Sequence, residues 1–179
     1  EESGKANTQL IALGSHGRGG LEKLRFGSVA ETVLRDSRFN VLSVGANVPN
    51  DQDTEISKIL CPIDRSADSV DALKYAVSLA NALNSKLVVL RVAESKSDLS
   101  EFPEVCDLIS EDSRRNCDLQ EITKTGDFTA QIIKETAAQN ADLIVMGVRH
   151  RLFSDESLGE NTSEIIRRAG CPVITVVGM

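Results

Sequence analysis

The sequence contains no tryptophan, one tyrosine and five phenylalanines among its 179 residues, so it lacks the aromatic platform on which nucleic-acid bases stack. Basic residues are also scarce, because 20 Lys and Arg stand against 27 Asp and Glu, for a formal net charge of −7. Charge of that sign repels nucleic acid and anionic lipid. The candidate basic patch, Arg149, His150 and Arg151, is too short to reverse the balance. We therefore expect no nucleic-acid partner.

Long apolar runs are missing as well. None approaches the roughly 20 residues that span a bilayer, and residues 1–10 are acidic and polar, unlike a secretory signal. We therefore expect no membrane partner and a cytoplasmic location. No cysteine stands in the C-x-x-C spacing of a zinc site or redox pair, and no metal-binding cluster surrounds either histidine. We expect no metal site, and reduced packing cysteines at Cys61, Cys106, Cys117 and Cys171.

From residue 56 onward, buried apolar runs alternate with helical periodicity. The helix at 66–84 shows it best, because Val70, Leu73 and Val77 recur at three- and four-residue steps. Apolar runs predict strands at 56–64, 86–94, 117–127, 142–148 and 171–178, and helices are expected at 66–84, 128–141 and 161–170, with a variable connection at 95–116 that holds a short helix. Strands that alternate with helices predict an α/β fold with a parallel sheet covered on both faces.

Three local details refine this prediction. Pro62 lacks a ladder donor, which a strand tolerates near its carboxyl end. The helix at 128–141 is expected to bury Ile132 and Ile133 together with Ala137 and Ala138. The last helix is expected to begin with a cap at Asn161 or Thr162 and to stop at Gly170.

Residues 9–45 repeat the end of this pattern as strand, glycine-rich loop, helix and strand. Leu13-Gly14 aligns with Met146-Gly147 at a shift of 133, and the last strands align at a shift of 132. We therefore divide the chain into a C-terminal half-unit at 1–46, a polar linker at 47–55 and a complete unit at 56–179. A two-stranded βαβ piece cannot bury both faces of its sheet, so we expect the first unit to be truncated.

The loop of the half-unit reads Gly14-x-x-Gly17, nine residues, then Gly27-Ser28. Glycines permit backbone angles that aim successive N–H groups at a phosphate. The N-terminus of the helix that begins near Ser28 adds partial positive charge. The Ser28 hydroxyl can donate to the same phosphate, and Arg18 can add charge. A tight strand-to-helix connection without a ligand is the structural alternative.

This loop resembles the nucleotide loop of the universal stress protein family, G-x2-G-x9-G-[ST], and "KILCPIDRSADSVDALKYAVSLA" resembles that family's opening strand and helix. The resemblance covers nearly the whole chain and implies a tandem member with a doubly wound five-stranded parallel sheet in the order 3-2-1-4-5. It implies that the last strands of two units pair, and that the nucleoside lies between Asp64 and Gly147, although Asp64 could instead cap the following helix. The candidate nucleotide-binding residues are Gly14, Gly17, Arg18, Gly27, Ser28, Val29, Asp64 and Gly147.

The second unit departs from the loop pattern. His150 stands where the second glycine belongs, and Glu160-Asn161 stand where Gly-Ser is expected, so a carboxylate would face the phosphate. No nucleophile with its base is evident, so we expect no enzyme and no catalytic residue. Two functions remain, a stress-response regulatory protein that binds ATP or another adenine nucleotide at its first loop, or a nucleotide-free dimerisation scaffold.

Overall fold

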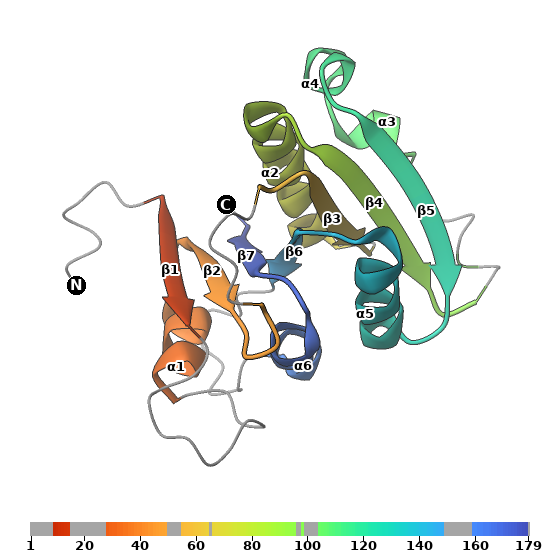
Figure 1. Ribbon diagram of the computed structural model, residues 1–179. Helices are drawn as coiled ribbons and strands as arrows, with labels where there is room; N and C mark the ends of the chain where they lie inside the picture. The colour runs from red at the N-terminus through yellow and green to blue at the C-terminus, as the bar shows by residue number, and fades with distance from the viewer. Residues whose placement is uncertain are drawn as a thin grey trace.

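The computed structural model describes residues 9–14, 28–49, 55–64, 66–95, 98, 104–148 and 159–178. These residues form a seven-stranded sheet with helices on both faces (Figure 1). The strands are β1 Leu10–Gly14, β2 Asn40–Val44, β3 Lys58–Ile63, β4 Lys86–Ala93, β5 Leu119–Thr125, β6 Leu143–Val148 and β7 Val173–Val177. The helices are α1 Ser28–Asp36, α2 Ala67–Leu83, α3 Val105–Leu108, α4 Glu111–Arg115, α5 Phe128–Gln139 and α6 Glu160–Arg168.

The second unit is a parallel sheet with β3 at its centre. Its strands lie in the order β5-β4-β3-β6-β7, which is the expected order 3-2-1-4-5. The pairing of β3 with β6 joins Ile59 to Leu143 and Leu60 to Ile144 in parallel register. These central strands are apolar at consecutive positions because helices cover both faces. The α/β prediction and the central pairing are confirmed.

The sheet differs from the expected one because it does not end at β7. It continues through β2 to β1, so that the strands of the half-unit and of the second unit belong to one sheet. Strand β2 pairs antiparallel with β7, with Val41 opposite Thr175 and Ser43 opposite Val173, as the family resemblance implied for these last strands. The Thr175 hydroxyl also donates to the Val41 carbonyl at 3.3 Å. Each strand thereby covers the other's edge, which would otherwise offer unpaired backbone groups.

The residues that follow β2 fasten the half-unit to α6. A Cβ on Gly45 would lie 2.6 Å from the carbonyl oxygen of Ile166, so this close approach of loop and helix requires glycine. The side-chain amide of Asn47 donates to the Arg167 carbonyl at 3.0 Å. Asn47 thus satisfies one of the backbone carbonyls that the end of a helix leaves unpaired.

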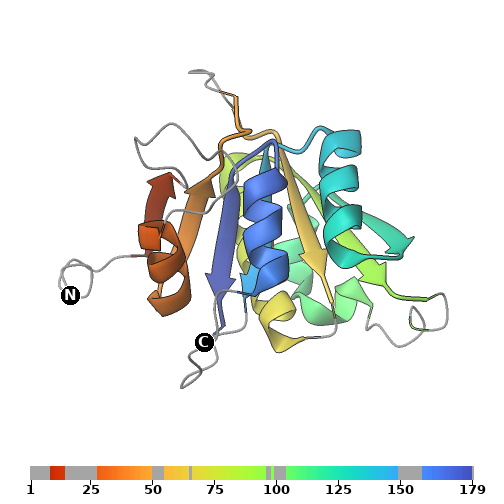
Figure 2. The same ribbon diagram turned by 90° about the horizontal axis from the view of Figure 1, so that it is seen from below.

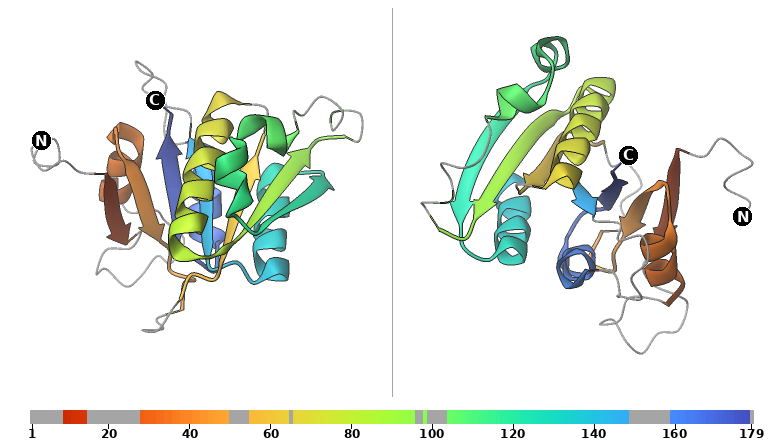
Figure 3. Two further views of the ribbon diagram at one scale, coloured as in Figure 1. Left: turned by 90° about the horizontal axis from the view of Figure 1, so that it is seen from above. Right: turned by 180° about the vertical axis from the view of Figure 1, so that it is seen from behind.

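Helices divide between the two faces of the sheet. Helices α2 and α3 lie on one face, and α1, α5 and α6 lie on the other (Figures 2 and 3). Fully buried Leu73 of α2 belongs to the first core and fully buried Ile165 of α6 to the second. Among the described elements, no helix covers β1 and β2 on the α2 face (Figure 3). Leu10 and Val44 are accordingly 39% exposed there.

Two expectations about helices were wrong. The cap residue of α6 is Gly159, whereas Asn161 and Thr162 lie inside the helix and Thr162 is buried. Helix α5 does bury Ile132, but its inward face continues with Glu135 and Thr136, while Ala137 and Ala138 are exposed. A prediction from apolar residues alone assigned the wrong side of α5 to the core. A carboxylate can be buried where a neighbouring element supplies its counter-ion.

That counter-ion comes from β5. The Lys124 ammonium lies 3.1 Å from the Glu135 carboxylate, whose side chain is 4% exposed. The Thr136 hydroxyl in turn donates to the Ile132 carbonyl at 2.7 Å, within its own helix. The polar groups of Glu135 and Thr136 therefore have partners inside the core.

The prediction for Pro62 is confirmed, because it lies in β3, one residue before the end of that strand.

Candidate functional site

Asp64 lies directly after the carboxyl end of β3, where a polar network fixes its carboxylate. Oδ1 accepts a hydrogen bond from the Ser66 amide at 2.8 Å and from the Ser69 hydroxyl at 2.6 Å. The Asp64 amide donates to the Ser69 hydroxyl oxygen at 3.1 Å. The N-cap of α2 is Ser66, whose side chain accepts from the Ser69 amide. Asp64 therefore orients the turn before α2 without being the helix cap.

Gly147 is the fifth residue of β6 and packs against the first turn of α2. A Cβ at this position would lie 2.3 Å from the Asp68 carbonyl oxygen and 2.9 Å from the Ser69 amide nitrogen, closer than real Cβ contacts. The approach of helix to strand accounts for this glycine without any ligand. Asp64 and Gly147 are thus brought to the same helix turn, and Ser69 contacts Asp64 directly.

The first candidate loop connects β1 to α1, in the strand-to-helix setting that phosphate loops need. Gly14 is the last residue of β1, and a Cβ there would meet no atom within 4 Å. Val29 stands in the first turn of α1 and is 76% exposed. Outside the described residues lie Gly17, Arg18, Gly27, the Ser28 side chain, Arg149, His150 and Arg151.

The predicted residues fall at two separate places. Strands β2, β7 and β6 lie between β1 and β3, a separation of about 19 Å at about 4.8 Å per strand. Because β2 and β7 run antiparallel, the carboxyl ends of β1 and of β3 lie at opposite edges of the sheet (Figure 2). Asp64 therefore cannot complete a nucleotide site around Gly14. The glycine loop of the half-unit and the Asp64–Gly147 pair of the second unit are therefore two separate candidate sites.

The edge that holds Asp64 also carries the N-terminus of α6. Among the residues that the structure describes, no side chain caps that terminus at Gly159, and exposed Glu160 stands in its first turn. A carboxylate there occupies the favourable end of the helix dipole and repels a phosphate. We expected the second loop to bind a phosphate poorly, and the structure gives a physical reason. The backbone amides of the α6 terminus are present, but the negative charge of Glu160 beside them is unfavourable for an anion.

Ser66 and Ser69, which hold the Asp64 carboxylate in place, were not among the predicted site residues. A signal was present, because a serine directly before a helical period is typical of a helix N-cap. The prediction assigned only Asp64 and Gly147 to this edge, because a single sequence shows these residues but not the direction in which the turn after Asp64 folds.

The described cysteines do not form a reactive centre. Cys61, Cys117 and Cys171 are free thiols, and burial raises the pKa of Cys61 and of Cys171 to about 12. Burial, and after it the charge of Asp118, also raises the pKa of Cys117. A raised pKa keeps a thiol protonated and poorly nucleophilic. Among the residues placed by the structure, no three His, Cys, Asp or Glu side chains gather as a metal site, and no helix is long and apolar enough to cross a membrane.

The chain is similar to proteins of one family. A model of the universal stress protein family matches residues 1–45 and 55–177. Universal stress protein Sll1654 from Synechocystis is 29% identical over 131 residues, which cover 66% of this chain and 83% of that protein.

Solved structures share the fold. A universal stress protein from Archaeoglobus fulgidus aligns over 99% of this chain with a TM-score of 0.78 at 24% identity, and this chain spans 65% of its length. Protein PA1789 from Pseudomonas aeruginosa aligns over 99% of this chain and 66% of its own, with a TM-score of 0.70 at 14% identity. A universal stress protein in complex with cAMP aligns over 70% of this chain and 100% of its own, with a TM-score of 0.58 at 20% identity.

Proposed function

This chain belongs to the universal stress protein family, and from that premise we propose a stress-response regulatory module of the tandem type. Its nucleotide site is the loop between Gly14 and Ser28, and its ligand is ATP or another adenine nucleotide. The module works by binding and is not an enzyme. It acts in the cytoplasm, where the bound nucleotide tunes association with partners.

The observation that carries the proposal is the place of the glycine pattern in the fold. Its first glycine, Gly14, ends β1, and its last residue, Ser28, begins α1, so the pattern occupies the segment between a strand and a helix. The amides at the start of a nine-residue helix and the permissive glycines suit a phosphate group. The solved relative with cAMP is consistent with an adenine nucleotide as the ligand class.

The same geometry limits how tightly this chain binds. Among the described strands, none beside β1 brings an aspartate to the nucleoside of a nucleotide bound at this loop, because Asp64 lies at the opposite edge of the sheet. We expect this chain to bind ATP weakly, with a dissociation constant above a millimolar. The contacts that remain are those of the phosphates with the loop and the helix terminus.

Calorimetry and ligand-observed NMR with ATP test this proposal. Weak binding should disappear in a Gly27→Glu variant, which places a carboxylate in the cradle, and should persist in the control Gly20→Glu, which adds the same charge outside the glycine pattern. Asp64→Ala should have no effect. Sub-millimolar binding that survives Gly27→Glu and is lost in Asp64→Ala would move the working site to the second unit and overturn the proposal.

A nucleotide-free scaffold is the second candidate, and the junction of β2 with β7 favours it. That junction combines antiparallel strand pairing with the bond from Asn47 to Arg167, so it holds the two units together without any ligand. For this scaffold function, ATP should leave the midpoint of thermal unfolding unchanged even at ligand concentrations of tens of millimolar.

A further inference from the structure

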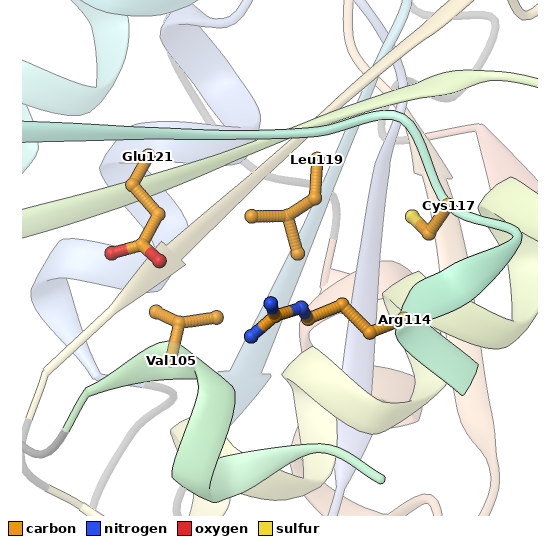
Figure 4. Close-up of a pocket in the computed structure, with 5 residues that line it drawn as sticks. All are labelled: Val105, Arg114, Cys117, Leu119 and Glu121. Atoms are coloured by element: carbon orange, nitrogen blue, oxygen red, sulfur yellow. The ribbon is translucent and has the colours of Figure 1, made fainter. Parts of the chain in front are cut away.

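A cavity of about 430 Å³ lies between the edge strand β5 and the short helices α3 and α4. It is distant from the proposed nucleotide loop, because β5 lies at one end of the sheet and β1 at the other. Its volume falls within the roughly 300–1,000 Å³ of small-molecule pockets. The described residues that line it are Val105, Arg114, Cys117, Leu119 and Glu121 (Figure 4).

Two opposite charges face this cavity, and they are not paired with each other. Among the described residues, the Arg114 guanidinium has neither an ion-pair nor a hydrogen-bond partner, and it extends between Val105 and Leu119 (Figure 4). Glu121 contributes a carboxylate from β5. The cavity therefore combines a cationic group, an anionic group and an apolar surface.

The Glu121 carboxylate is held in place from behind. Its Oε2 accepts a hydrogen bond at 2.7 Å from Arg91 of β4, whose side chain is 10% exposed. Arg91 also lies 3.5 Å from Glu104, and its buried Nε has no partner among the described groups. Because a buried guanidinium holds the Glu121 side chain from the β4 side, its carboxylate can accept a further hydrogen bond on the cavity side.

We propose that this cavity binds a small zwitterion with an apolar side chain, of the aliphatic α-amino acid class. The ligand carboxylate pairs with Arg114, its ammonium group donates to Glu121, and its side chain contacts Val105 and Leu119. A simple anion would meet repulsion from Glu121, and a simple cation would meet repulsion from Arg114. Only a ligand that carries both charges satisfies both groups. This inference is independent of the proposed nucleotide function.

Three matched probes separate these contributions. Leucine carries both charges, 4-methylpentanoate lacks the ammonium group, and isoamylamine lacks the carboxylate. In titrations of the whole chain followed by backbone amide NMR shifts, leucine should bind with a dissociation constant in the millimolar range or below. Each single-charge probe should bind at least about tenfold more weakly, a difference that corresponds to about 1.4 kcal/mol.

The chain offers a matched pair of variants. Arg114→Gln should weaken leucine binding about tenfold, whereas Arg115→Gln should not, because Arg115 pairs with Glu111 and Asp112 of its own helix. Both side chains are exposed, so both variants should keep the fold. Leucine should also slow the alkylation of Cys117 by iodoacetamide, measured by peptide mass mapping, in the wild-type chain but not in Arg114→Gln.

Absence of leucine binding at tens of millimolar would overturn the proposal. Equal binding of leucine and 4-methylpentanoate would also overturn it, since Glu121 would then contribute nothing. Equal effects of the Arg114 and Arg115 substitutions would place the ligand elsewhere on the chain. Glu121→Gln, checked for folding by its amide spectrum, should reduce leucine binding while leaving the weak binding of 4-methylpentanoate unchanged or stronger.

Discussion

The internal repeat supplies two glycines at corresponding positions whose surroundings differ completely, and substituting each by alanine should give opposite results. At Gly147 the new methyl group would lie 2.3 Å from the Asp68 carbonyl oxygen and 2.5 Å from its carbonyl carbon. The backbone of α2 must then shift by about 1 Å to reach ordinary contact distance. Overpacking of this kind costs about 1–3 kcal/mol.

The shift also disturbs the network around Asp64, because Ser69 both donates to its carboxylate and accepts from its amide. A hydrogen bond of this kind contributes about 0.5–1.5 kcal/mol net. We therefore expect Gly147→Ala to lower the free energy of unfolding by about 2–4 kcal/mol. At Gly14 no atom lies within 4 Å of the position that a Cβ would occupy, so Gly14→Ala should be neutral or stabilising by up to about 1 kcal/mol.

Urea unfolding followed by far-ultraviolet circular dichroism measures both variants. With a denaturant dependence of about 2 kcal/mol per molar, Gly147→Ala should lower the unfolding midpoint by roughly 1–2 M, while Gly14→Ala should leave it within about 0.5 M. Equal shifts for the two variants would show that the contact with α2 does not explain Gly147. A neutral Gly147→Ala would refute the packing argument outright.

Two further predictions concern buried polar groups. The buried Ser43 hydroxyl has no partner among the described groups, so Ser43→Ala should raise the free energy of unfolding by about 1 kcal/mol. Thr175→Val removes the bond to the Val41 carbonyl and should lower the free energy of unfolding by about 1 kcal/mol. If both variants change the stability in the same direction in urea unfolding, this reasoning is contradicted. Burial raises the pKa of Cys61 and of Cys171 to about 12. The folded chain therefore keeps thiol protons that the unfolded chain loses above a pH of about 9. The free energy of unfolding should consequently fall as the pH rises from about 9 to about 12. Cys61→Ala should make that fall shallower by about 1.4 kcal/mol per pH unit, and identical slopes in urea unfolding across this range would disprove the assignment.

Local patterns in the sequence were sufficient to predict most of the second unit. Residues such as Val70, Leu73 and Val77 recur with the period of a helix, and continuous apolar runs mark strands that are buried on both faces. The antiparallel neighbours β2 and β7 were predicted from the family resemblance of the two units. The spacing of apolar residues along the chain determines which side chains share a face of a helix or strand, so these elements can be predicted from the sequence without knowledge of the fold.

Tertiary structure decided what depends on neighbours distant in sequence. Glu135 is buried because Lys124 approaches it from another element, and no period along α5 contains that information. Gly147 must be glycine because α2 packs against it, although the sequence motif suggested a ligand. The cavity beside Glu121 brings that residue of β5 together with Arg114 of α4, and Arg91 of the adjacent strand bonds to the Glu121 carboxylate. Charge pairing and close contact are properties of distances in space, and these arise only when the strands have taken their places in the sheet.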